Sequence, residues 1–462
     1  MVDERKKGTR DMNTIRMTLT ATEVPISSRP AASRFRWLVL ALIFVVFLVA
    51  GADRANIGVI VPVIKEEFKL TNTDIGAMAS LFYLGYSTIQ IPVGLLYERF
   101  GVRRILSFAL FATSISTLFM GLATSALQLK ACRIALGFAE GPINIGILTI
   151  INRWFPPAEK GTATGIFISS IKVAPAVVPP ICALVIYYFG WREVFYFFSV
   201  PGLLLAVIWF IFVQDNPRDS RFCSAAELTT IEDTHTKETG KIPVHRMSMP
   251  LLDRLIRAKR MQPLSSNAAV LRSWDVWGCA IGYSFMVGIV YAIMTWVPTY
   301  LVNVKKFPLF EMGFVASTPW IGAIIGNVVG GLLSDRVLGA RRKPLMILTS
   351  ASTIVMMYLL IYAPANPWLL SGLFILTGIL LSLGYSTFLV YPMGLVTKEK
   401  IPFAASIVNT GGSLGGAFSP FVVGLILDSF NWDAVFLFLA FTSLLTFLVV
   451  LSIIEPVTAE AE

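Results

Sequence analysis

Five charged residues lie inside stretches of sequence that are otherwise apolar, namely Asp53, Arg54, Arg133, Glu140 and Lys172. A charge near the middle of a lipid bilayer costs about 3 kcal/mol on insertion scales, and such residues usually face the interior of a helix bundle or a water-filled cavity. The three cations and two carboxylates have a formal sum of +1. A cavity that they line would attract an anion, and its two carboxylates could take up and release protons.

The elements that must position these charges are membrane helices. The chain of 462 residues is 55% hydrophobic and only 14% charged, whereas soluble domains are about 25% charged. A helix needs about 20 apolar residues to cross a bilayer, and runs of this length occur twelve times. The expected spans are 36–64, 74–97, 103–123, 126–153, 159–188, 192–213, 273–302, 310–335, 343–363, 367–396, 402–428 and 432–454.

We therefore expect an all-α membrane protein with twelve transmembrane helices in two six-helix halves. The expected parts are a cytoplasmic N-terminal tail (1–35), an N-terminal six-helix bundle (36–213), a cytoplasmic linker (214–272), a C-terminal six-helix bundle (273–454) and a short cytoplasmic tail (455–462). Within the linker, an amphipathic stretch around Leu251–Lys259 could lie on the membrane surface.

The distribution of basic residues predicts the orientation of the chain. Of the 38 Lys and Arg residues, 29 lie in segments on one side of the expected helices, about six lie on the other side and three lie within the membrane. The positive-inside rule then places both termini and the linker in the cytoplasm. The net charge of +10 thus follows from topology. The lipid bilayer is an expected partner of this protein, and nucleic acid is not.

The sequence contains no arrangement that is typical of an enzyme or a metal site. The cysteines, Cys132, Cys182, Cys223 and Cys279, show no metal-binding spacing, and both histidines lie in the linker. There is no nucleophile–base pair and no phosphate-binding loop. We expect no catalytic residue, disulfide, metal or organic cofactor. We also expect the first apolar run to be a membrane helix and not a cleavable signal peptide.

The two halves repeat a loop motif. The second expected helix ends in Gly94–Arg104, which reads GLLYERFGVRR, and the eighth ends in Gly331–Arg342, which reads GLLSDRVLGARR. Both resemble the Gly-x-Leu-x-Asp-Arg-x-Gly-x-Arg loop of the major facilitator superfamily, although the first copy has Glu98 in place of Asp and the second has one extra residue before Gly339. The resemblance implies two six-helix halves that rock about a substrate site near mid-membrane.

An acid followed by basic residues at a helix end can dock onto neighbouring helices and hold one conformation. The residues with this latch role would be Gly94, Glu98, Arg99, Arg103, Asp335, Arg336 and Arg341. The alternative is that these residues only anchor the helix ends at the cytoplasmic face. An acid at the same place in both repeats favours the latch, because topology alone does not require it.

A finer resemblance involves the first and fourth expected helices. The segments that carry it are 53–58, 133–142 and 152–161. They are similar to the anion:cation symporter branch of that superfamily, whose members import sugar acids, tartrate or aromatic carboxylates. The resemblance implies that Asp53 and Glu140 carry the coupling protons, and that Arg54 and Arg133 attract the carboxylate of the substrate.

Helix geometry agrees with these roles. Arg133 and Glu140 are two turns apart, so they share one stripe of a helix and lie about 10 Å apart along its axis. The depth of Asp53 falls between theirs at about 1.5 Å per residue. Asp53 could pair with Arg133 when ionised and free that arginine when protonated. Lys172 lies at about the level of Glu140, and two interpretations stay open: a structural pair with Glu140, or a second substrate anchor that would suit a dianion.

Uncharged polar residues complete the candidate site. Besides the cations Arg54, Arg133 and Lys172, the expected substrate contacts are Tyr86, Gln90, Tyr291, Ser386 and Asn409. A charged first half opposite a hydrogen-bonding second half suits a substrate with an anionic head and a hydroxylated body. For each uncharged residue the alternative is a structural role, either an ordinary interhelical hydrogen bond of about 0.6 kcal/mol or, for Tyr86, aromatic packing.

The expected function is import of a small organic anion by proton symport with alternating access, across the inner membrane of a bacterium. A sugar acid such as an aldonate, hexuronate or glucarate is favoured, ahead of an aromatic carboxylate or a sulfonate. Each chain should hold a complete pathway and work as a monomer. The alternatives are an uncoupled exchanger or facilitator and, with less support, a non-transporting nutrient sensor. A drug:proton antiporter is disfavoured because the fifth helix lacks a Gly-Pro-Gly-Gly pattern.

Overall fold

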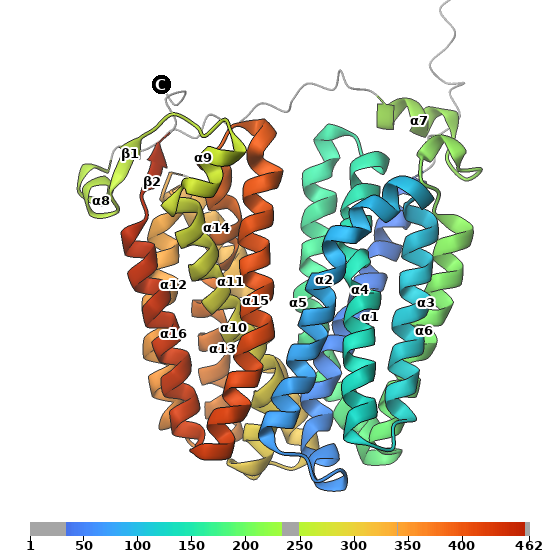
Figure 1. Cartoon of the computed structure of the whole chain (residues 1–462), viewed down its shortest axis with the longest axis vertical. Coiled ribbons are helices and arrows are strands. Elements are labelled where there is room, and N and C mark those ends of the chain that lie inside the picture. The colour runs from blue at the N-terminus through green and yellow to red at the C-terminus, as the bar shows by residue number, and fades with distance from the viewer. Residues whose placement is uncertain (1–33, 233–248, 340, 458–462) are drawn as a thin grey trace, which may run out of the picture.

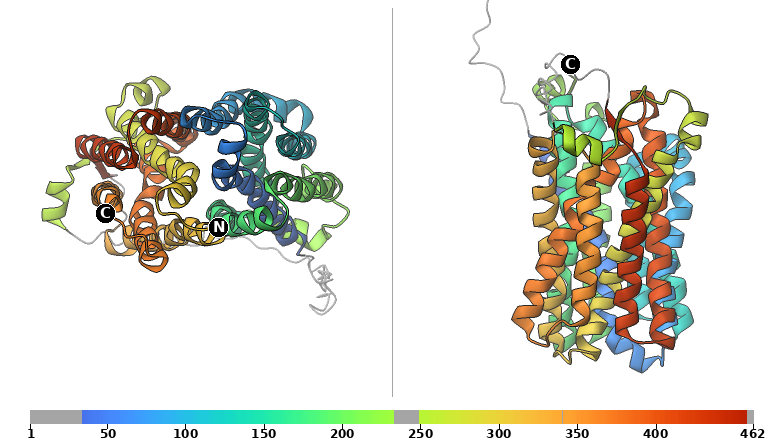
Figure 2. Two further views of the ribbon diagram at one scale, coloured as in Figure 1. Left: turned by 90° about the horizontal axis from the view of Figure 1, so that it is seen from below. Right: turned by 90° about the vertical axis from the view of Figure 1, so that its left-hand side faces the viewer.

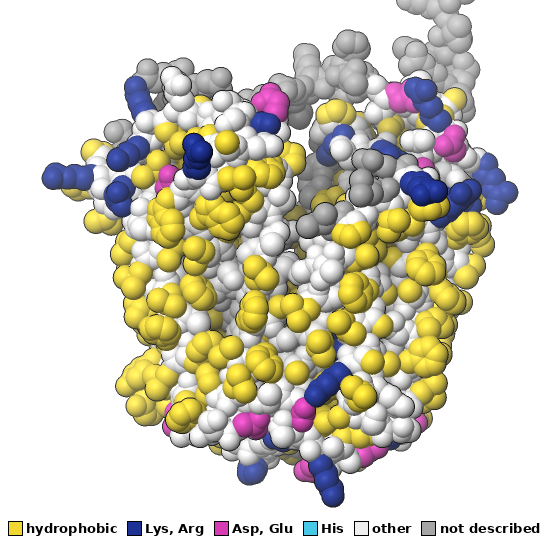
Figure 3. Space-filling model, in the orientation of Figure 1, with side chains coloured by type: hydrophobic (Ala, Val, Ile, Leu, Met, Phe, Trp, Pro, Cys, Tyr) yellow, Lys and Arg dark blue, Asp and Glu magenta, His cyan; other side chains and the backbone are white. Residues whose placement is uncertain are grey.

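The structure is a computed structural model, and it describes residues 34–232, 249–339 and 341–457. Within these residues the chain forms two bundles of long helices that stand side by side (Figures 1 and 2). The surface has a broad apolar middle, and charged side chains gather at its two ends (Figure 3). Such a surface matches a protein whose middle section contacts lipid. Nearly all of the expected N-terminal tail lies outside the described residues.

Six helices form the first bundle. They are α1 (Phe35–Glu67), α2 (Asn72–Phe100), α3 (Val102–Gly121), α4 (Ala126–Trp154), α5 (Pro157–Tyr188) and α6 (Trp191–Phe212). Local sequence sets where they begin and end. Thr71 and Asp74 form a capping box at the start of α2, and the Ser125 side chain caps α4. Between α2 and α3, Gly101 has a φ of +80°, a conformation that glycine adopts at little cost.

The second bundle repeats this plan. Its helices are α10 (Trp274–Asn303), α11 (Leu309–Leu332), α12 (Lys343–Ile361), α13 (Pro367–Leu383), α14 (Tyr385–Val390), α15 (Ile401–Ser429) and α16 (Trp432–Ser452). Helix α11 continues into a π-helical turn, Leu333–Val337. Helices α13 and α14 and a 3₁₀ turn make one span that is interrupted at Gly384, because the Gly384 N–H donates to the Thr349 hydroxyl on α12 at 2.6 Å.

The prediction of an all-α membrane protein in two six-helix halves is confirmed. In the described part of the chain, eleven helices are long and apolar enough to cross a bilayer. The remaining expected span is α2, which has 29 residues but carries Tyr, Ser, Thr and Gln side chains along its length. One small exception to the all-α architecture is present, since β1 (Ala258–Arg260) pairs in parallel with β2 (Glu455–Val457).

The same pair of helices packs closely in each half because glycines lie at the crossing. A Cβ on Gly137 of α4 would lie 2.1 Å from the carbonyl oxygen of Phe82 on α2. In the second half, a Cβ on Gly378 of α13 would lie 1.9 Å from the carbonyl oxygen of Pro319 on α11. Small residues let membrane helices approach to backbone contact. The repeat is therefore visible in the packing as well as in the loop motif.

The two bundles contact each other at the end opposite the linker. Asp428 at the end of α15 accepts hydrogen bonds from the backbone N–H groups of Asn72 and Thr73, at 2.9 and 2.8 Å. These are first-turn donors of α2 that have no partner within their own helix. Just inside this contact, a Cβ on Gly76 would lie 2.5 Å from the carbonyl oxygen of Pro420. This end of the molecule is therefore closed.

Toward the linker the two bundles separate (Figure 1). An added Cβ at Gly94 on α2, or at Gly161 and Gly165 on α5, would meet nothing within 4 Å. On the facing part of the second bundle, Asn409 and Thr410 of α15 are exposed. The two bundles are thus further apart at the linker end than at the end where Asp428 joins them.

The linker is attached to the first bundle through α7 (Ala225–Glu232), which follows a 3₁₀ turn at Pro217–Asp219. The buried Glu227 carboxylate accepts hydrogen bonds from the backbone N–H groups of Phe35 and Arg36 at 3.1 and 3.0 Å. The Arg36 guanidinium also pairs with both Glu227 and Glu159. Helix α7 thus ties the start of α1 to the start of α5.

The later part of the linker is attached to the second bundle. It contains α8 (Pro250–Leu255) and α9 (Asn267–Arg272), and a 3₁₀ turn at Lys398–Lys400 lies on the same side of that bundle. The expected amphipathic stretch coincides with α8 and β1, where Leu251 and Leu255 are exposed.

Candidate functional site

An ion pair between Arg54 on α1 and Glu140 on α4 lies inside the first bundle. The Arg54 Nη2 and Nε atoms lie 2.5 and 2.6 Å from Glu140 Oε1. The Glu140 side chain is fully buried, whereas 12% of the Arg54 side chain is exposed. The guanidinium also lies 5.1 Å from the centre of the Tyr86 ring, within the range of a cation–π contact. Glu140 Oε2 has no hydrogen-bond partner among the described residues.

Arg133 and Asp53 are both buried beside this pair. Arg133 donates from Nη1 to the backbone carbonyl of Asp53 at 3.1 Å and from Nε to that of Met78 at 3.4 Å. The Asp53 Oδ1 atom and both polar side-chain atoms of the neighbouring Asn56 have no hydrogen-bond partner among the described residues. The site therefore combines a closed ion pair with polar groups that water or a proton could satisfy.

The expected pairing of the Asp53 carboxylate with Arg133 is absent from the described residues, and Glu140 pairs with Arg54 instead. Consecutive residues of a helix do not face the same neighbour. The Arg54 side chain on α1 therefore lies against α4. Arg133 contacts Asp53 through its backbone carbonyl and not through its carboxylate. Spacing within α4 could not reveal this, because the rotation of α1 relative to α4 depends on packing. The proton-coupling roles of Asp53 and Glu140 stay predictions.

Lys172 extends from α5 toward the second bundle. Its Nζ atom lies 4.4 Å from the centre of the Tyr385 ring on α14, and no ion pair of Lys172 is present in the part of the chain that the structure describes. The structural pair with Glu140 is therefore not formed in this conformation, in which Glu140 pairs with Arg54. The role of Lys172 as a substrate anchor stays a prediction.

Tyrosines line the boundary between the two bundles. The rings of Tyr83 on α2 and Tyr291 on α10 are 4.1 Å apart, and the hydroxyl groups of Tyr283 and Tyr385 are 3.3 Å apart. The sequence predicts a role for Tyr291 and for Ser386, but it does not single out Tyr385. Nothing in the local sequence indicates that the Tyr385 ring meets Lys172.

The other expected contacts lie on α2, α14 and α15. Tyr86 is buried against Arg54, and Gln90, one turn further along α2, is half-buried. Ser386 on α14 is half-buried, and Asn409 on α15 is exposed. The role of these residues in substrate binding stays a prediction.

The first copy of the loop motif is held by an acid that the sequence did not single out. Asp215, just after α6, accepts a hydrogen bond from the Arg103 backbone N–H at 2.8 Å, and the Arg103 side chain donates to Gln214 at 2.9 Å. Arg99 is exposed and Gly94 faces open space. The side chain of Glu98 lies outside the described residues, so its latch role is not observed.

The second copy is held in a similar way. Glu455, just after α16, accepts hydrogen bonds from the backbone N–H groups of Arg342 and Lys343 at 3.0 and 2.8 Å. Arg341 pairs with Asp253 of α8 at 2.6 Å. Asp335 pairs with Arg342 at 2.7 Å, and Arg336 is exposed.

The two acids share a sequence signal. Asp215 and Glu455 each stand two residues after the residue that caps the last helix of their half, Val213 and Ile453. Alignment of the ends of the two halves could therefore have found them.

A family model described as Major Facilitator Superfamily matches residues 43–396 and, in a second and overlapping match, residues 308–462. The chain belongs to the major facilitator superfamily. It is a multi-pass membrane transporter and not an enzyme, as expected from the sequence. A solved structure has a similar fold: a bacterial homologue of the human lysosomal transporter Spinster, in an inward-facing and unoccupied conformation, has a TM-score of 0.70 at 17% identity, and the match covers 91% of this chain and 98% of that chain.

Curated relatives within the superfamily carry the names of sugar-acid transporters. The protein named "Probable galactarate/D-glucarate transporter GarP" of Escherichia coli K12 is 29% identical over 426 residues, which cover 87% of this chain and 91% of that protein. The D-galactonate transporter of E. coli O6:H1 is 26% identical over 431 residues, which cover 92% and 96%. The resemblance to sugar-acid transporters is thus confirmed for the chain as a whole.

Proposed function

We propose that the protein imports a small organic anion, a sugar acid, by proton symport with alternating access. Relatives with similar sequences over nearly their whole length are named as transporters of galactarate, D-glucarate and D-galactonate. The observation that carries the proposal is the ion pair of Arg54 with Glu140, which places an anion-binding group and a titratable group in direct contact.

This contact supports coupling because a substrate carboxylate and Glu140 compete for the same guanidinium. Protonation of Glu140 removes its charge, and Arg54 is then free to bind a carboxylate in bidentate fashion. When the proton leaves, Glu140 reclaims Arg54 and the substrate loses its partner. In a buried site, an ionised Glu140 that is separated from Arg54 is unfavourable, because its charge has no partner. A substrate anion bound next to the ionised Glu140 carboxylate is also unfavourable, because the two negative charges repel each other. Proton and anion therefore move together.

Asp53 and Arg133 form a second layer of the proposed mechanism. Asp53 is buried and its Oδ1 atom has no hydrogen-bond partner among the described residues, so it is suited to hold a second exchangeable proton. Arg133 is held by two backbone carbonyls and contributes a fixed positive charge near the ion pair. Protons are the only coupling ion that the proposal requires, with no other cofactor.

The conformation fits the inward half of a transport cycle. The bundles meet at the end opposite the linker and separate toward it, and the positive-inside rule assigns the linker end to the cytoplasm. In a bacterial inner membrane the cavity would then face inward with the Arg54–Glu140 pair closed, the state expected after the substrate and its proton have left. One chain holds both bundles and the whole cavity, so a monomer suffices.

Uptake into proteoliposomes tests this proposal. Purified protein is given a panel of labelled sugar acids, aromatic carboxylates and sulfonates, with and without an inward proton gradient. We expect one class of acid to accumulate above equilibrium only when the gradient is present. Equilibration that is indifferent to the gradient would favour an uncoupled exchanger or facilitator, and binding without any uptake would favour a sensor.

A further inference from the structure

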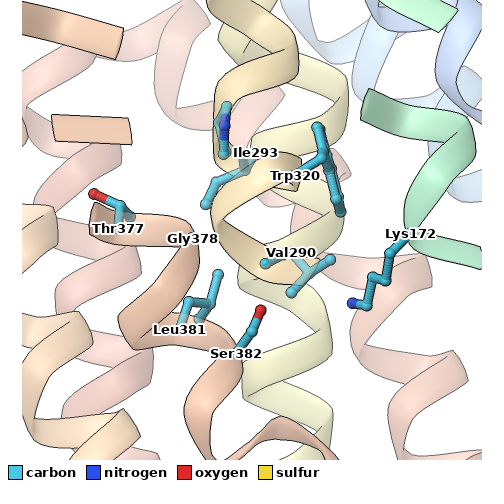
Figure 4. A pocket seen from close by; sticks show the side chains of 10 residues that line it. Lys172, Val290, Ile293, Trp320, Thr377, Gly378, Leu381 and Ser382 are labelled. Atoms are coloured by element: carbon cyan, nitrogen blue, oxygen red, sulfur yellow. The ribbon is translucent and has the colours of Figure 1, made fainter. Parts of the chain in front are cut away.

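Lys172 of the first bundle lines a pocket whose other lining residues all belong to the second bundle. The other residues that line this pocket are Val290, Ile293, Pro319, Trp320, Ala323, Thr377, Gly378, Leu381 and Ser382. They come from α10, α11 and α13, and most of them are apolar. Figure 4 shows the Lys172 side chain directed from α5 toward Val290 and Ser382. An ammonium group thus enters apolar surroundings across the boundary between the two bundles.

The charge of Lys172 has no protein counter-ion within the described residues. The Glu140 carboxylate forms its ion pair with Arg54. The acids of the second half lie at the ends of its helices or outside them: Asp275, Glu311, Asp335, Glu399, Asp428, Asp433 and Glu455. The contact of Lys172 with the Tyr385 ring at 4.4 Å compensates only part of the cost of removing an ammonium from water. A bound anion would supply the missing partner.

Lys172 and Arg54 are placed to hold two ends of one molecule. Ala174 on α5 packs against Gly51 on α1, where a Cβ on Gly51 would lie 2.5 Å from the Ala174 Cβ. Both helices start at the linker end. Lys172 precedes Ala174 by two residues and Arg54 follows Gly51 by three, so the Cα atoms of the two residues are separated along the helix axes by about 7.5 Å. A short carbon chain with an acid group at each end spans such a separation.

Tyrosines lie close to both cations. Tyr86 lies against Arg54 and Tyr385 lies against Lys172. Tyr83 of the first bundle contacts Tyr291 of the second, and Tyr283 contacts Tyr385 within the second bundle. Their hydroxyl groups can donate to and accept from the hydroxyl groups of a sugar acid.

We propose that the physiological substrate is a dianion, such as a sugar diacid, whose two acid groups bridge Arg54 and Lys172. This inference rests on the proposed function, and it gives Lys172 the role of a second anion-binding residue. The charges agree with this. Arg54 is free for a substrate only when Glu140 is protonated, and in that state neither the Arg54 nor the Lys172 charge is matched by a carboxylate of the described residues. A sugar acid with a single carboxylate would leave one of these charges unmatched.

Equilibrium binding to matched acids tests this role. Each pair differs only in its second acid group: a six-carbon aldarate against the corresponding aldonate, a benzene dicarboxylate against benzoate, and a sulfonated carboxylate against its unsulfonated form. Wild type, Lys172→Gln and Lys172→Arg are compared, with Lys306→Gln as a control at an exposed loop lysine. Thermal unfolding and size-exclusion profiles check that each variant is folded.

We expect wild type to bind the diacid of one pair at least tenfold more tightly than its monoacid. Lys172→Gln should lose about tenfold or more in affinity for the diacid and less than about threefold for the monoacid. Lys172→Arg should keep most of the preference, and Lys306→Gln should match wild type. Equal losses for both acids in Lys172→Gln, or no preference for a diacid in wild type, would overturn the proposal.

The outcomes separate this proposal from the proposed function. Binding is measured without a proton gradient, so an uncoupled transporter with a diacid preference would keep the role of Lys172 while the symport proposal failed. Proton-driven uptake of a monoacid with no gain from a second acid group would keep the symport proposal and remove the role of Lys172. If no acid of the panel binds wild type, both are wrong.

Discussion

The two halves of the molecule share their mechanics and differ in their chemistry. In each half a glycine brings the same pair of helices into backbone contact, Gly137 in the first and Gly378 in the second. In each half an acid after the last helix holds the loop motif, Asp215 and Glu455. All five charges that interrupt the apolar stretches lie in the first half. Duplication has thus kept the framework that moves, whereas the chemical groups have been concentrated on one side of the cavity.

The largest expected effect comes from removing the charge centre of the first half. Arg54→Gln leaves Glu140 as a buried carboxylate without its cation, which costs about 3–5 kcal/mol, and it should abolish substrate binding. The Arg54→Gln/Glu140→Gln double variant should recover most of the stability but no binding. Thermal unfolding in detergent and equilibrium binding measure both effects.

A surface pair provides the control for this experiment. Arg192→Gln removes the exposed ion pair with Glu67, in which both side chains are more than a third exposed, and should change stability by less than about 1 kcal/mol. A wild-type unfolding temperature and intact binding in Arg54→Gln would show that the ion pair is not the centre of the site.

The next effect tests whether the packing is equivalent in the two halves. A methyl group on Gly137 or Gly378 would overlap a carbonyl oxygen of the neighbouring helix, so Gly→Ala at either position should lower stability by about 1–3 kcal/mol. Gly165→Ala in the first half and Gly372→Ala in the second have open space around them. These controls should be neutral or stabilising by up to about 1 kcal/mol.

The unfolding temperatures of the four glycine-to-alanine variants are measured and compared with that of the wild type. A loss at Gly137 without one at Gly378 would break the equivalence of the two halves in their packing.

A smaller effect is expected at the two acids that hold the loops. Asp215→Asn and Glu455→Gln remove charge from groups that accept backbone N–H bonds at the starts of α3 and α12, an interaction worth about 1–2 kcal/mol. Glu455 is buried and accepts two such bonds, so its replacement should cost more. Unfolding temperature and the initial rate of uptake report the change. Equal stability of both variants and wild type would show that the loops are held by other contacts.

The smallest effect is expected from the uncharged half. Asn409→Ala and Ser386→Ala should each weaken substrate binding by about threefold, the equivalent of one interhelical hydrogen bond of about 0.6 kcal/mol. Titration of a labelled substrate into the purified variants measures this loss. A loss of a hundredfold at either position would mean that the second half carries more of the recognition than its lack of charge indicates.

Much of the fold could be predicted from the sequence because length and apolarity determine where a chain can cross a bilayer. The starts of α1, α4 and α16 lie within one residue of the expected positions. The break at Gly384 was not predictable, since it depends on a hydroxyl group of α12. The docking of α7 through Glu227 was also missed, because a single acid in a polar linker gives no signal of the N–H groups that it will meet.

The composition of the site was predictable but its pairing was not. The cost of burying charge singles out the five residues from sequence alone. Which carboxylate meets which guanidinium depends on helix rotation, so Glu140 paired with Arg54 and the Asp53 side chain was left without Arg133. The partner of Lys172 lies on a helix more than two hundred residues away, beyond the reach of spacing arguments.

The central claim is that Glu140 couples proton movement to anion movement by competing for Arg54. The most direct measurement compares wild type and Glu140→Gln in proteoliposomes for gradient-driven accumulation and for counterflow exchange of the same acid. We expect Glu140→Gln to lose accumulation and to retain exchange, because its neutral amide leaves Arg54 available to the substrate in both directions. Accumulation that responds to the proton gradient as strongly in Glu140→Gln as in wild type would contradict the account.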